Sequence, residues 1–598
     1  MILQRLAEHY DRIVSSGKGE AELAPPGFSR QKISFCVVLE PDGRLNQFKD
    51  MREEVGKLRV AKSMIVPGQS KATGSGFHPC FLWDNTSYLL GWNSDAKKAT
   101  RAVRSFEEFR KKHLKLEDRI AHPSFTAVCS FLRMWSPEMA KQYRELLEEV
   151  ETGFGVFRVV AEMNYVHEVV TVPSEGDENM SEESEEPAGD ISGICLVSGV
   201  TGIIARLHEP KIKGVINSPS YGALLVSCKD SAYRSYGKTQ GYNAPVSSEV
   251  AFKYATALNH LLNRPDRRVS LGDSTVVFWA DHPNVLEDCL SELFAEVLPN
   301  EGPVVEEDQE RVRQARLLLT ELRDGAAGPA EPEDGLPTKL FLLGLSPNAS
   351  RISVRLWVEA DAAELRDRLG KHLRDIALSY AKDDRLLTLR RIVAATGRWD
   401  EKKARFETEN VSPQLAGDLA RSVLTGAAYP QSMLATMIRR IHSDGEVAYA
   451  RVAAIKACLV RNSRLRGNPL EVSVMLDTTN TDPAYCCGRA FALLEMIQKD
   501  SVEGELNKTI KDSYFSSAST TPSLVFPRLC RLSQHHLAKL DTGPRIYREK
   551  QVGEVLGKLD SFPRHLSLED QGKFVLGYFH QRQDLYTSKK DKKEGANA

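Results

Sequence analysis

The sequence predicts an α+β protein, in which a mixed α/β N-terminal region is followed by a C-terminal α-helical bundle. Short apolar runs bounded by turn residues are concentrated before Ala360, and beyond it apolar residues recur at helical spacing nearly throughout. The chain has 598 residues, which is too long for one hydrophobic core. We therefore expect an α/β region over 1–335, a strand hairpin plus helices over 336–470, and a helical bundle over 471–598.

The N-terminal region begins with an amphipathic helix and continues as strands and helices. A strand is expected within Lys32–Leu45, closed by the turn Pro41-Asp42-Gly43, because these residues favour tight turns. The segment Cys80–Trp92 predicts a hairpin with Asp84-Asn85 at its turn. Residues 98–150 alternate charged and apolar groups at helical spacing, which predicts helices.

Further along, the block Ile212–Ser247 reads as short apolar strands broken by polar residues and tyrosines. A helix over Ser248–Leu262 and a strand over Ser274–Asp281 come next. The Gly- and Pro-rich segment Asp324–Pro337 predicts a linker. A two-strand hairpin around Ser346-Pro347-Asn348 then leads into the predicted helices.

The net charge of −1 hides a marked asymmetry. Residues 174–190 carry eight acidic side chains and no basic one, which predicts a flexible insertion. From Arg451 to the end there are 23 Lys and Arg against 17 Asp and Glu. Such an excess indicates an anionic partner for the basic part, although a solvated helical surface gives the same composition.

Signatures of enzymes and cofactor sites are missing from the sequence. There is no phosphate-binding GxxxxGK[ST] loop, GxSxG elbow, HExxH zinc helix or GxGxxG fingerprint. Asp281 and His282 are neighbours, but a metal site needs more ligands than two. The ten cysteines form no CxxC pair, which predicts reduced thiols. With no apolar run of 18 residues or more, we expect a cytoplasmic protein without cofactor, metal or membrane partner.

The segment Ser523–Leu540 contains the adjacent histidines His535 and His536. On a helix the two point in different directions, so a shared metal or proton relay is not expected. The apolar stripe comprises Val525, Leu529, Leu532, His536 and Leu540. The neighbouring basic stripe comprises Arg528, Arg531, His535 and Lys539. Such a stripe would contact phosphates without reading bases.

Two Gly- and Ser-rich loops carry residues suited to nucleic acid. The first spans Val66–Pro79 and the second lies in the block Ile212–Ser247. Small residues let backbone N–H groups approach phosphates or base edges closely. The second block adds tyrosines on which bases could stack, namely Tyr221, Tyr233, Tyr236 and Tyr242. Plain surface loops with half-packed tyrosines remain the alternative.

Four stretches together resemble a known family. They are VSCKDSAYRSYGKTQGYNAPVSSEVAFKYATALNHLL, LGLSPNASRISVRLW, CCGRAFALLEMIQ and YFSSASTTPSLVFPRL followed by HHLAKL. In this order they are similar to the large subunit of the type I-C CRISPR surveillance complex, Cascade, from the N-terminal helix to about Leu540. The chain departs from the family's usual Ser-Phe-Asn at Ser227-Cys228-Lys229. The acidic insertion is a second departure.

The resemblance implies a non-catalytic subunit of a crRNA-guided antiviral complex. Such a subunit recognises the protospacer-adjacent motif (PAM) on double-stranded DNA, helps to open the strands and stabilises the R-loop. Its expected partners are crRNA, target DNA, the other Cascade subunits and a helicase–nuclease that cleaves the opened DNA. A small subunit translated from the same gene would start at Met475, which precedes a segment of about that subunit's size. A core methionine is the alternative reading of Met475.

Residues suited to these roles follow from the two loops and the basic C-terminal part. For the motif and duplex DNA we choose Lys71, Thr73, Ser75, His78, Lys211, Lys213, Asn217, Ser220 and Tyr221. For RNA or subunit contact we choose Tyr236, Lys238 and Asn243. For the displaced strand we choose Arg464, Arg466, Arg489, Lys508, Lys511, Arg528, Arg531 and Lys539.

Two other functions stay open on the sequence alone. A metal-free RNA-processing nuclease needs only a general base and a charge stabiliser, for which Tyr236, Lys238 and His260 are conceivable. A helical scaffold that contacts only proteins would also lack enzyme motifs. Nucleic acid that co-purifies with the protein and is released by salt would exclude the scaffold.

Overall fold

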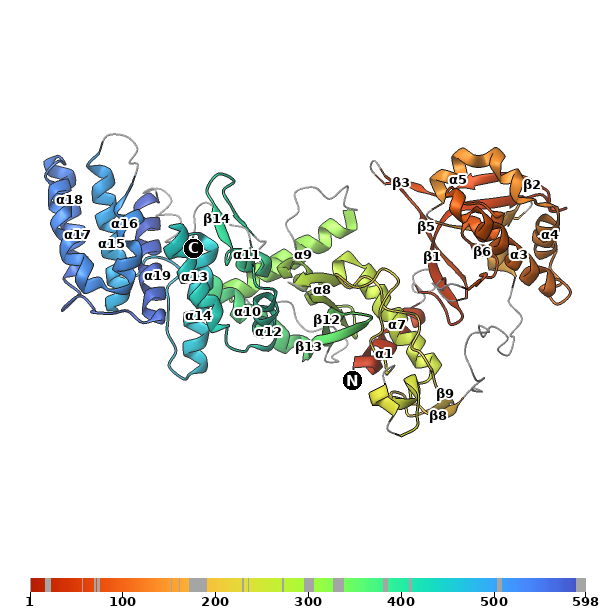
Figure 1. Ribbon diagram of the computed structural model, residues 1–598. Helices are drawn as coiled ribbons and strands as arrows, with labels where there is room; N and C mark the ends of the chain where they lie inside the picture. Colours follow the sequence, from red (N-terminus) through yellow and green to blue (C-terminus); the bar gives the residue numbers. More distant parts are fainter. Residues whose placement is uncertain are drawn as a thin grey trace. The chain divides into compact units, whose positions relative to one another are not determined.

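The computed structural model describes most of the chain (Figure 1). The described residues are 2–16, 23–55, 58–68, 71, 76–151, 153–160, 162–170, 191–228, 231–234, 236–271, 274–294, 306–325, 338–379, 386–407, 411–502 and 508–587. Thr73, Ser75, the acidic insertion at 174–190, Lys229 and most of the predicted linker lie outside them.

The chain divides into two compact units. Unit 1 comprises Met1–Gly214, Ser218–Asn263 and Pro347–Ser353, and unit 2 comprises Val215–Asn217, Arg264–Ser346 and Val354–Ala598. The predicted α+β class is confirmed, with the strands concentrated in the first 361 residues and helices dominating after them. None of the described helices is long and apolar enough to cross a membrane.

A five-stranded sheet forms the centre of unit 1. Its order is β2-β1-β7-β6, with β5 paired to the first half of β1. Only β1 and β7 run parallel, and the second half of β1 lies between β2 and β7. The strands are β1 (Phe28–Leu39), β2 (Leu45–Asp50), β5 (Lys62–Pro67), β6 (Trp83–Asp84) and β7 (Phe154–Val159). A small hairpin, β3 (Glu53–Val55) and β4 (Leu58–Val60), leads from β2 to β5.

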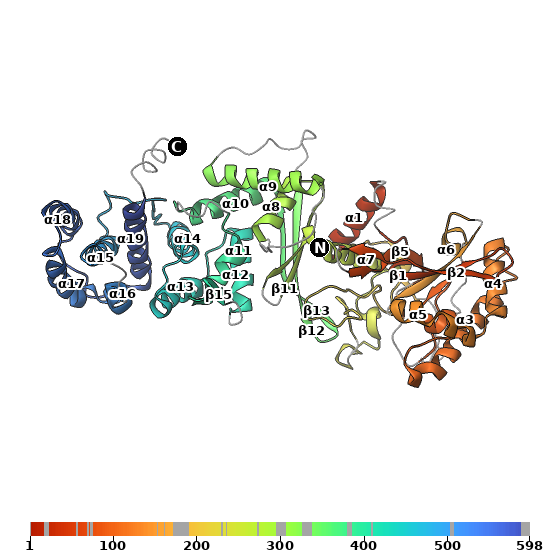
Figure 2. The same ribbon diagram turned by 90° about the horizontal axis from the view of Figure 1, so that it is seen from above.

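Helices of residues 86–150 pack on this sheet, and the aromatic residues between them form its core (Figure 2). The helices are α2 (Thr86–Leu90), α3 (Ala99–Leu116), α4 (Pro123–Met134) and α5 (Arg144–Val150), followed after β7 by α6 (Val166–Val169). Phe35, Phe106, Phe125 and Phe157 are completely buried there. The predicted helices of 98–150 and the turn at Gly43, with a φ of 89°, are confirmed.

The predicted hairpin over Cys80–Trp92 is wrong. Asp84 ends β6, and the Asn85 side chain accepts hydrogen bonds from the backbone N–H groups of Ser87 and Tyr88. An asparagine that caps backbone donors in this way starts a helix instead of a turn between strands. The second half of the expected hairpin is therefore helix α2, which ends at Gly91 in the left-handed conformation.

The remainder of unit 1 combines two packed helices with an irregular segment. Helix α1 (Ile2–Ser15) packs on α7 (Ser248–Asn263), which matches the helix predicted over Ser248–Leu262. The described part of the segment 191–247 has only one short hairpin, β8 (Ser192–Ile194) and β9 (Thr201–Ile203), and two 3₁₀ turns. The strands expected within Ile212–Ser247 reduce to isolated bridges, because glycines with positive φ at 214, 222 and 237 break the extended backbone.

Unit 2 begins with a four-stranded antiparallel sheet of order β10-β11-β12-β13. Its strands are β10 (Arg268–Leu271), β11 (Ser274–Ala280), β12 (Lys339–Asn348) and β13 (Arg351–Asp361). The predicted β11 is confirmed, but the β12–β13 turn lies at Ala349-Ser350, where Ala349 has a φ of 53°. Helices α8 (Val285–Phe294), α9 (Glu306–Asp324) and α10 (Ala362–Ile376) contribute to the same core.

The rest of unit 2 is helical, as predicted, and Figure 2 views its last helices nearly along their axes. Only the hairpin β14 (Arg398–Asp400) and β15 (Arg405–Glu407) interrupts the described helices. These are α11 (Leu389–Ala394), α12 (Pro413–Thr425), α13 (Gln431–Asp444), α14 (Tyr449–Leu465), α15 (Pro483–Asp500), α16 (Ile510–Thr520), α17 (Pro522–Leu537), α18 (Thr542–Leu556) and α19 (Leu568–Tyr586).

Two glycines allow α15 and α19 to cross in close contact. A β-carbon at Gly488 would overlap the carbonyl oxygen of Phe574, and one at Gly577 would overlap that of Tyr485. The helix backbones therefore touch at this crossing, which requires residues without side chains. By contrast, Gly553 on α18 is exposed and has no atom within 4 Å of such a β-carbon.

The substitution Gly577→Ala is expected to destabilise the bundle, because the two backbones must separate. Overpacking of this kind costs about 1–3 kcal/mol or more. The matched control, Gly553→Ala, is expected to stabilise the helix by about 0.5–1 kcal/mol. Chemical unfolding, followed by the fluorescence of residues in unit 2, measures the change in the free energy of unfolding for both variants. Equal effects of the two substitutions would contradict the close crossing.

Candidate nucleic-acid interface

Lys71, in the first predicted DNA-reading loop, forms a buried ion pair. Its ammonium nitrogen lies 2.5 Å from Oδ2 of Asp84, whose side chain is fully buried, and it also donates to the carbonyl oxygen of His78. The same ammonium lies 3.4 Å from the centre of the Tyr88 ring. Only 14% of the Lys71 side chain is exposed. Its positive charge compensates the buried carboxylate of Asp84, and its hydrogen bond to His78 holds the loop in place.

His78 belongs to the same anchored loop. Its backbone N–H donates to the Tyr88 hydroxyl, and Lys112 donates to the carbonyl oxygen of Pro79. The backbone N–H of Cys80 donates to Asp84. Among the described residues of this loop, the polar groups thus serve to fix its course, and its role in DNA binding stays a prediction.

The second predicted loop brings three of its chosen residues together. Ile212 and Ala223 exchange two backbone hydrogen bonds of 2.9 Å, which align Lys211 and Lys213 with Gly222. Gly222 has a φ of 92°, and a β-carbon there would lie 2.8 Å from that of Lys211. The Lys211 ammonium lies 5.5 Å from the centre of the Tyr221 ring, a cation–π geometry. Among the described residues, neither Lys211 nor Lys213 forms an ion pair.

The neighbouring chosen residues are exposed. The pKa of Lys213 is lowered by partial burial of its side chain and by the positive charge of the nearby Lys211. Ser220 and Asn217 lie at the surface, and Asn217 adopts a left-handed backbone with a φ of 59°, which asparagine tolerates better than most residues. Lys211 and Tyr221, by contrast, also line a pocket within unit 1.

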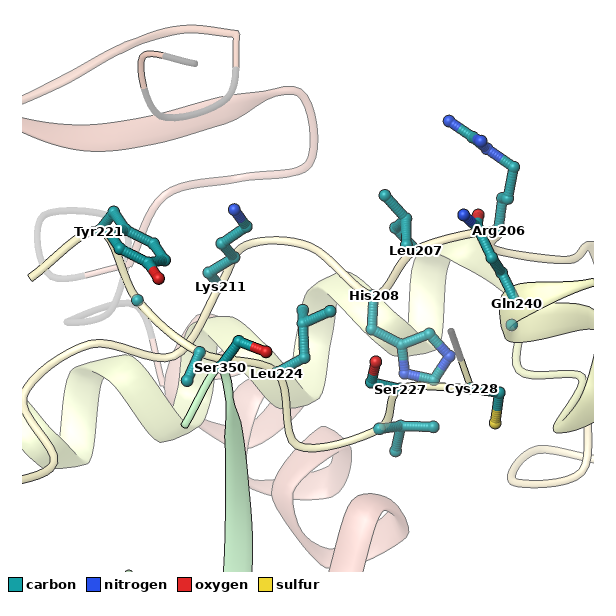
Figure 3. Close-up of a pocket in the computed structure, with 14 residues that line it drawn as sticks. Arg206, Leu207, His208, Lys211, Tyr221, Leu224, Ser227, Cys228, Gln240 and Ser350 are labelled. Atoms are coloured by element: carbon teal, nitrogen blue, oxygen red, sulfur yellow. The ribbon is translucent and has the colours of Figure 1, made fainter. Parts of the chain in front are cut away.

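This pocket is a cavity of about 120 Å³ in the irregular segment (Figure 3). Residues of 206–241 line it together with Ser350. Figure 3 shows the His208 imidazole in the middle of the lining, with Leu224 and Ser227 on one side and Gln240 and Cys228 on the other. Arg206 and Lys211 extend away from the imidazole, so the rim carries positive charge.

His208 is held from behind by α7. Its Nδ1 lies 2.7 Å from the hydroxyl of Tyr254, a residue of α7 that is 1% exposed. Burial lowers the pKa of His208 to about 4, so the ring is neutral at pH 7. The other ring nitrogen, Nε2, is buried and has no partner among the described residues.

The residues chosen for RNA or subunit contact surround the next turn. The Tyr236 side chain is 90% exposed, and Lys238 is exposed beside it. Asn243 is occupied: its side-chain amide donates to the carbonyl oxygens of Lys238 and Gln240 at 3.2 and 3.1 Å. Asn243 thus fixes the turn that places Gln240 at the pocket.

A second basic surface lies in unit 2 on α17 and on the turn after it, which contains Lys539. The predicted basic stripe is exposed, whereas the predicted apolar stripe is buried only in part, because Leu532, His536 and Leu540 are half-buried and Leu540 lies beyond the helix. Arg528, Arg531, His535 and Lys539 are exposed, whereas Val525 and Leu529 are buried. We call the four exposed residues the α17 ledge. His536 is half-buried, with its Nδ1 2.8 Å from the Ser501 hydroxyl, so the two histidines do point in different directions.

Three of the other residues chosen for the displaced strand have partners within unit 2. Arg464 donates to both carboxylate oxygens of Asp375, and Arg466 forms a two-pronged pair with Glu569. Arg489 is 6% exposed and donates to Gln581, so a surface role for it is wrong. Sequence periodicity could not reveal this, because α15 is buried on nearly all sides.

Lys508 and Lys511 flank the start of α16. Lys508 is exposed, and Lys511 is half-buried, with a pKa that burial lowers. Met475, the candidate internal start, lies in the loop between α14 and α15 with 49% of its surface exposed. The alternative that Met475 is a core residue of a strand or helix is therefore wrong.

The chain is similar to one known protein family. A family model described as CRISPR-associated protein (Cas_Csd1) matches residues 6–586. The chain belongs to this CRISPR-associated family. Membership supports a Cascade-type CRISPR protein. A comparison with curated proteins found no match.

The pocket contains residues that sequence reasoning missed. Arg206, His208 and Gln240 were not chosen, because the segment "ARLHEP" has no recognisable spacing and Gln240 lies in a turn. The glycines of this segment were a usable signal that its loops pack closely. Gly241 lies so close to the backbone of Ala205 and Arg206 that no side chain fits there, which indicates packed rather than open loops.

The substitution Lys71→Met is expected to destabilise unit 1, because it leaves the Asp84 carboxylate buried without its partner. The loss is about 3–5 kcal/mol, and the double variant Lys71→Met/Asp84→Asn should recover part of it. The control Lys211→Met, which breaks no ion pair, should change stability by less than about 0.5 kcal/mol. Thermal unfolding and hydrogen exchange in α2 measure these effects. A wild-type-like Lys71→Met protein would show that Lys71 is free for ligand.

Proposed function

We propose that this protein is the large subunit of a type I-C Cascade complex. In this role it reads the protospacer-adjacent motif on duplex DNA, helps to open it and stabilises the displaced strand. The observation that carries the proposal is the presence of two groups of cations without acidic partners among the described residues. One surrounds Lys211 and Tyr221 in unit 1, and the other is the α17 ledge in unit 2.

The α17 ledge suits a strand whose sequence is not read. Arg528, Arg531 and His535 lie three or four residues apart on one face of α17, and Lys539 follows in the turn after the helix. All four side chains are exposed, beside buried apolar residues that fix the helix in the bundle. Arg528 additionally lies 5.5 Å from the Tyr514 ring centre. Such an array neutralises successive phosphates and releases counterions, which makes binding strongly dependent on salt.

The loop around Lys211 suits contact with base edges. It combines lysines and the half-exposed ring of Tyr221 with a glycine that allows close backbone approach, and the amide-bearing Asn217 follows Lys213 by four residues in the sequence. Amide and ammonium groups bond base edges, and lysine favours a narrow A·T minor groove. Sequence beyond the motif would be read by the guide RNA through base pairing, and a separate helicase–nuclease would cut the opened DNA.

A subunit with this role is not itself a catalyst. The RNA-processing alternative needs Tyr236, Lys238 and His260 to act together. Tyr236 and Lys238 lie on an exposed turn, whereas His260 lies in the last turn of α7. No contact joins these three residues among the described interactions of unit 1, which favours the binding role. Partners would be crRNA, the other Cascade subunits and the helicase–nuclease.

The motif-reading role predicts that Lys211→Ala/Lys213→Ala/Asn217→Ala reduces discrimination between duplexes with matched and scrambled flanking motifs. A lost base contact removes about 1–3 kcal/mol of discrimination. Binding of the assembled complex to a pre-opened target should change little. The control variant Lys97→Ala/Lys98→Ala/Asn46→Ala removes the same groups elsewhere in unit 1. Unchanged discrimination in the first variant would remove the motif-reading site from this loop.

The ledge predicts a different response. Arg528→Gln/Arg531→Gln/Lys539→Gln should weaken target binding and lower the slope of log affinity against log salt by about 2, with motif preference intact. The control Arg466→Gln/Arg545→Gln/Lys371→Gln removes three positive charges that are already paired with carboxylates. Electrophoretic binding assays at several salt concentrations compare the two. Equal slopes in both variants would contradict the role of the ledge.

A separate small subunit would begin at Met475. The exposed loop position of this residue means that a chain starting there contains α15–α19 intact, including the α15–α19 crossing. Mass spectrometry of the purified complex should detect a fragment of residues 475–598, and Met475→Leu should abolish it. A complex without this fragment would refute the internal start.

A further inference from the structure

The cavity beside Lys211 contains a buried hydrogen-bond donor that none of the described residues satisfies. His208 is 2% exposed, and its Nδ1 lies 2.7 Å from the Tyr254 hydroxyl. Tyr254 is itself buried. Among the described residues, its hydroxyl proton has His208 Nδ1 as its acceptor. The neutral imidazole therefore carries its own proton on Nε2. This N–H belongs to a ring that lies in the middle of the cavity lining (Figure 3).

A buried acceptor lies on the same lining. Oε1 of Gln240 is buried and has no partner in the described part of the chain. Gln240 has a φ of 47°, a conformation that costs about 1 kcal/mol for a residue with a side chain. The turn is nevertheless fixed by the two hydrogen bonds from Asn243 and by the bond of 2.9 Å from Gly241 N–H to the Arg206 carbonyl oxygen. The protein thus holds Gln240 in place at a local cost.

The size and rim of the cavity indicate what it accepts. Its volume of about 120 Å³ is well below the roughly 300 Å³ or more of sites that enclose whole drug-sized ligands. It therefore fits one planar group of a larger molecule. Arg206, Lys211 and the Tyr221 ring stand around it, and no carboxylate is among the described residues that line it. Such a rim favours a group attached to phosphates.

We propose that this cavity accepts a single unpaired nucleobase of a bound nucleic-acid strand. The His208 Nε2–H would donate to a ring nitrogen or carbonyl oxygen of the base, and Gln240 Oε1 would accept from its N–H or amino group. Each nucleobase offers an acceptor beside a donor on its pairing edge, so the pocket recognises an unpaired base as such. Leu207, Leu224 and Val226 provide the apolar walls, and Lys211 and Arg206 contact the adjacent phosphates.

The same His–Tyr pair occurs twice in unit 2, which provides an internal comparison. His372 bonds Tyr429 and His580 bonds Tyr485 through Nδ1, and both leave Nε2 buried without a partner among the residues that the structure describes. Their surroundings differ from those of His208. The cavity at His580 has a volume of about 30 Å³, which is the share of one water molecule in the liquid. The cavity at His208, with about 120 Å³, has room for a base where the one at His580 does not.

This inference deepens the proposed function and rests on it, since the strand would come from the same complex. Two sources share the chemistry, the guide RNA and the DNA strand opened beside the motif. The experiment places 2-aminopurine, a base whose fluorescence rises when it leaves a stack, at successive unpaired positions of each strand. In the assembled complex, one position should brighten several-fold. A label in RNA or in DNA identifies the source.

Two variants with one control test the pocket directly. Ser227→Phe fills the cavity from its wall, and Gln240→Met removes the acceptor without changing the length of the side chain. Both should return the bright position to the background fluorescence. An abasic substitution at that position should weaken binding of its strand about tenfold in wild type and leave the variants unchanged. The control Gln47→Met, on the exposed strand β2, should behave like wild type.

Two results would overturn the inference. Either no position brightens in either strand, or the bright position persists in both pocket variants. A partner-protein peptide that cross-links to the cavity while no base does would show that the pocket binds a protein segment. Discrimination between matched and scrambled motifs, measured on the same preparations, tests the proposed function separately from the pocket. If discrimination is intact and no position brightens, the pocket is refuted and the proposed function stands.

Discussion

The structure depends on the rule that a buried charge needs a partner, since an unpaired one costs several kcal/mol. Asp375, 2% exposed at the end of α10, shows this in unit 2. It accepts from Arg461 at 2.9 Å and from Arg464, which joins α10 to α14. The Lys456 ammonium, its pKa lowered by burial to about 8, donates to the last carbonyl oxygens of the same helix. Lys71 and Asp84 obey the same rule in unit 1.

This rule divides the basic residues into those used for folding and those left for a ligand. The near-zero net charge of the chain says little about nucleic acid, because the two groups are mixed in the sequence. Two groups of cations without acidic partners among the described residues lie beside Tyr221 and at α17. The first combines charge with a pocket and polar groups, and the second offers charge alone. A CRISPR-associated protein of the proposed kind needs both, one to recognise a short motif and one to hold a strand of any sequence.

Sequence reasoning succeeded where periodicity decides the structure. The exposed basic stripe of α17 follows from the 3.6-residue period, and the fold class follows from where that period begins. It failed where contacts between residues that are distant in the sequence decide the structure. Nothing near Lys71 in the sequence shows that it pairs with Asp84, and nothing near Arg489 shows that α15 is buried. The pocket was missed for the same reason, since its donor depends on Tyr254 and its acceptor on a turn held by Asn243.

The measurement that tests this account most directly is photo-cross-linking of the assembled complex to target DNA and guide RNA, with the attached peptides identified by mass spectrometry. The account predicts cross-links to peptides of residues 206–243 and to α17. It predicts none to Arg464, Arg466 or Arg489, which have partners within unit 2. Cross-links concentrated on those paired arginines, with none at the two unpaired surfaces, would contradict the claim that ion pairing inside the protein determines where nucleic acid binds.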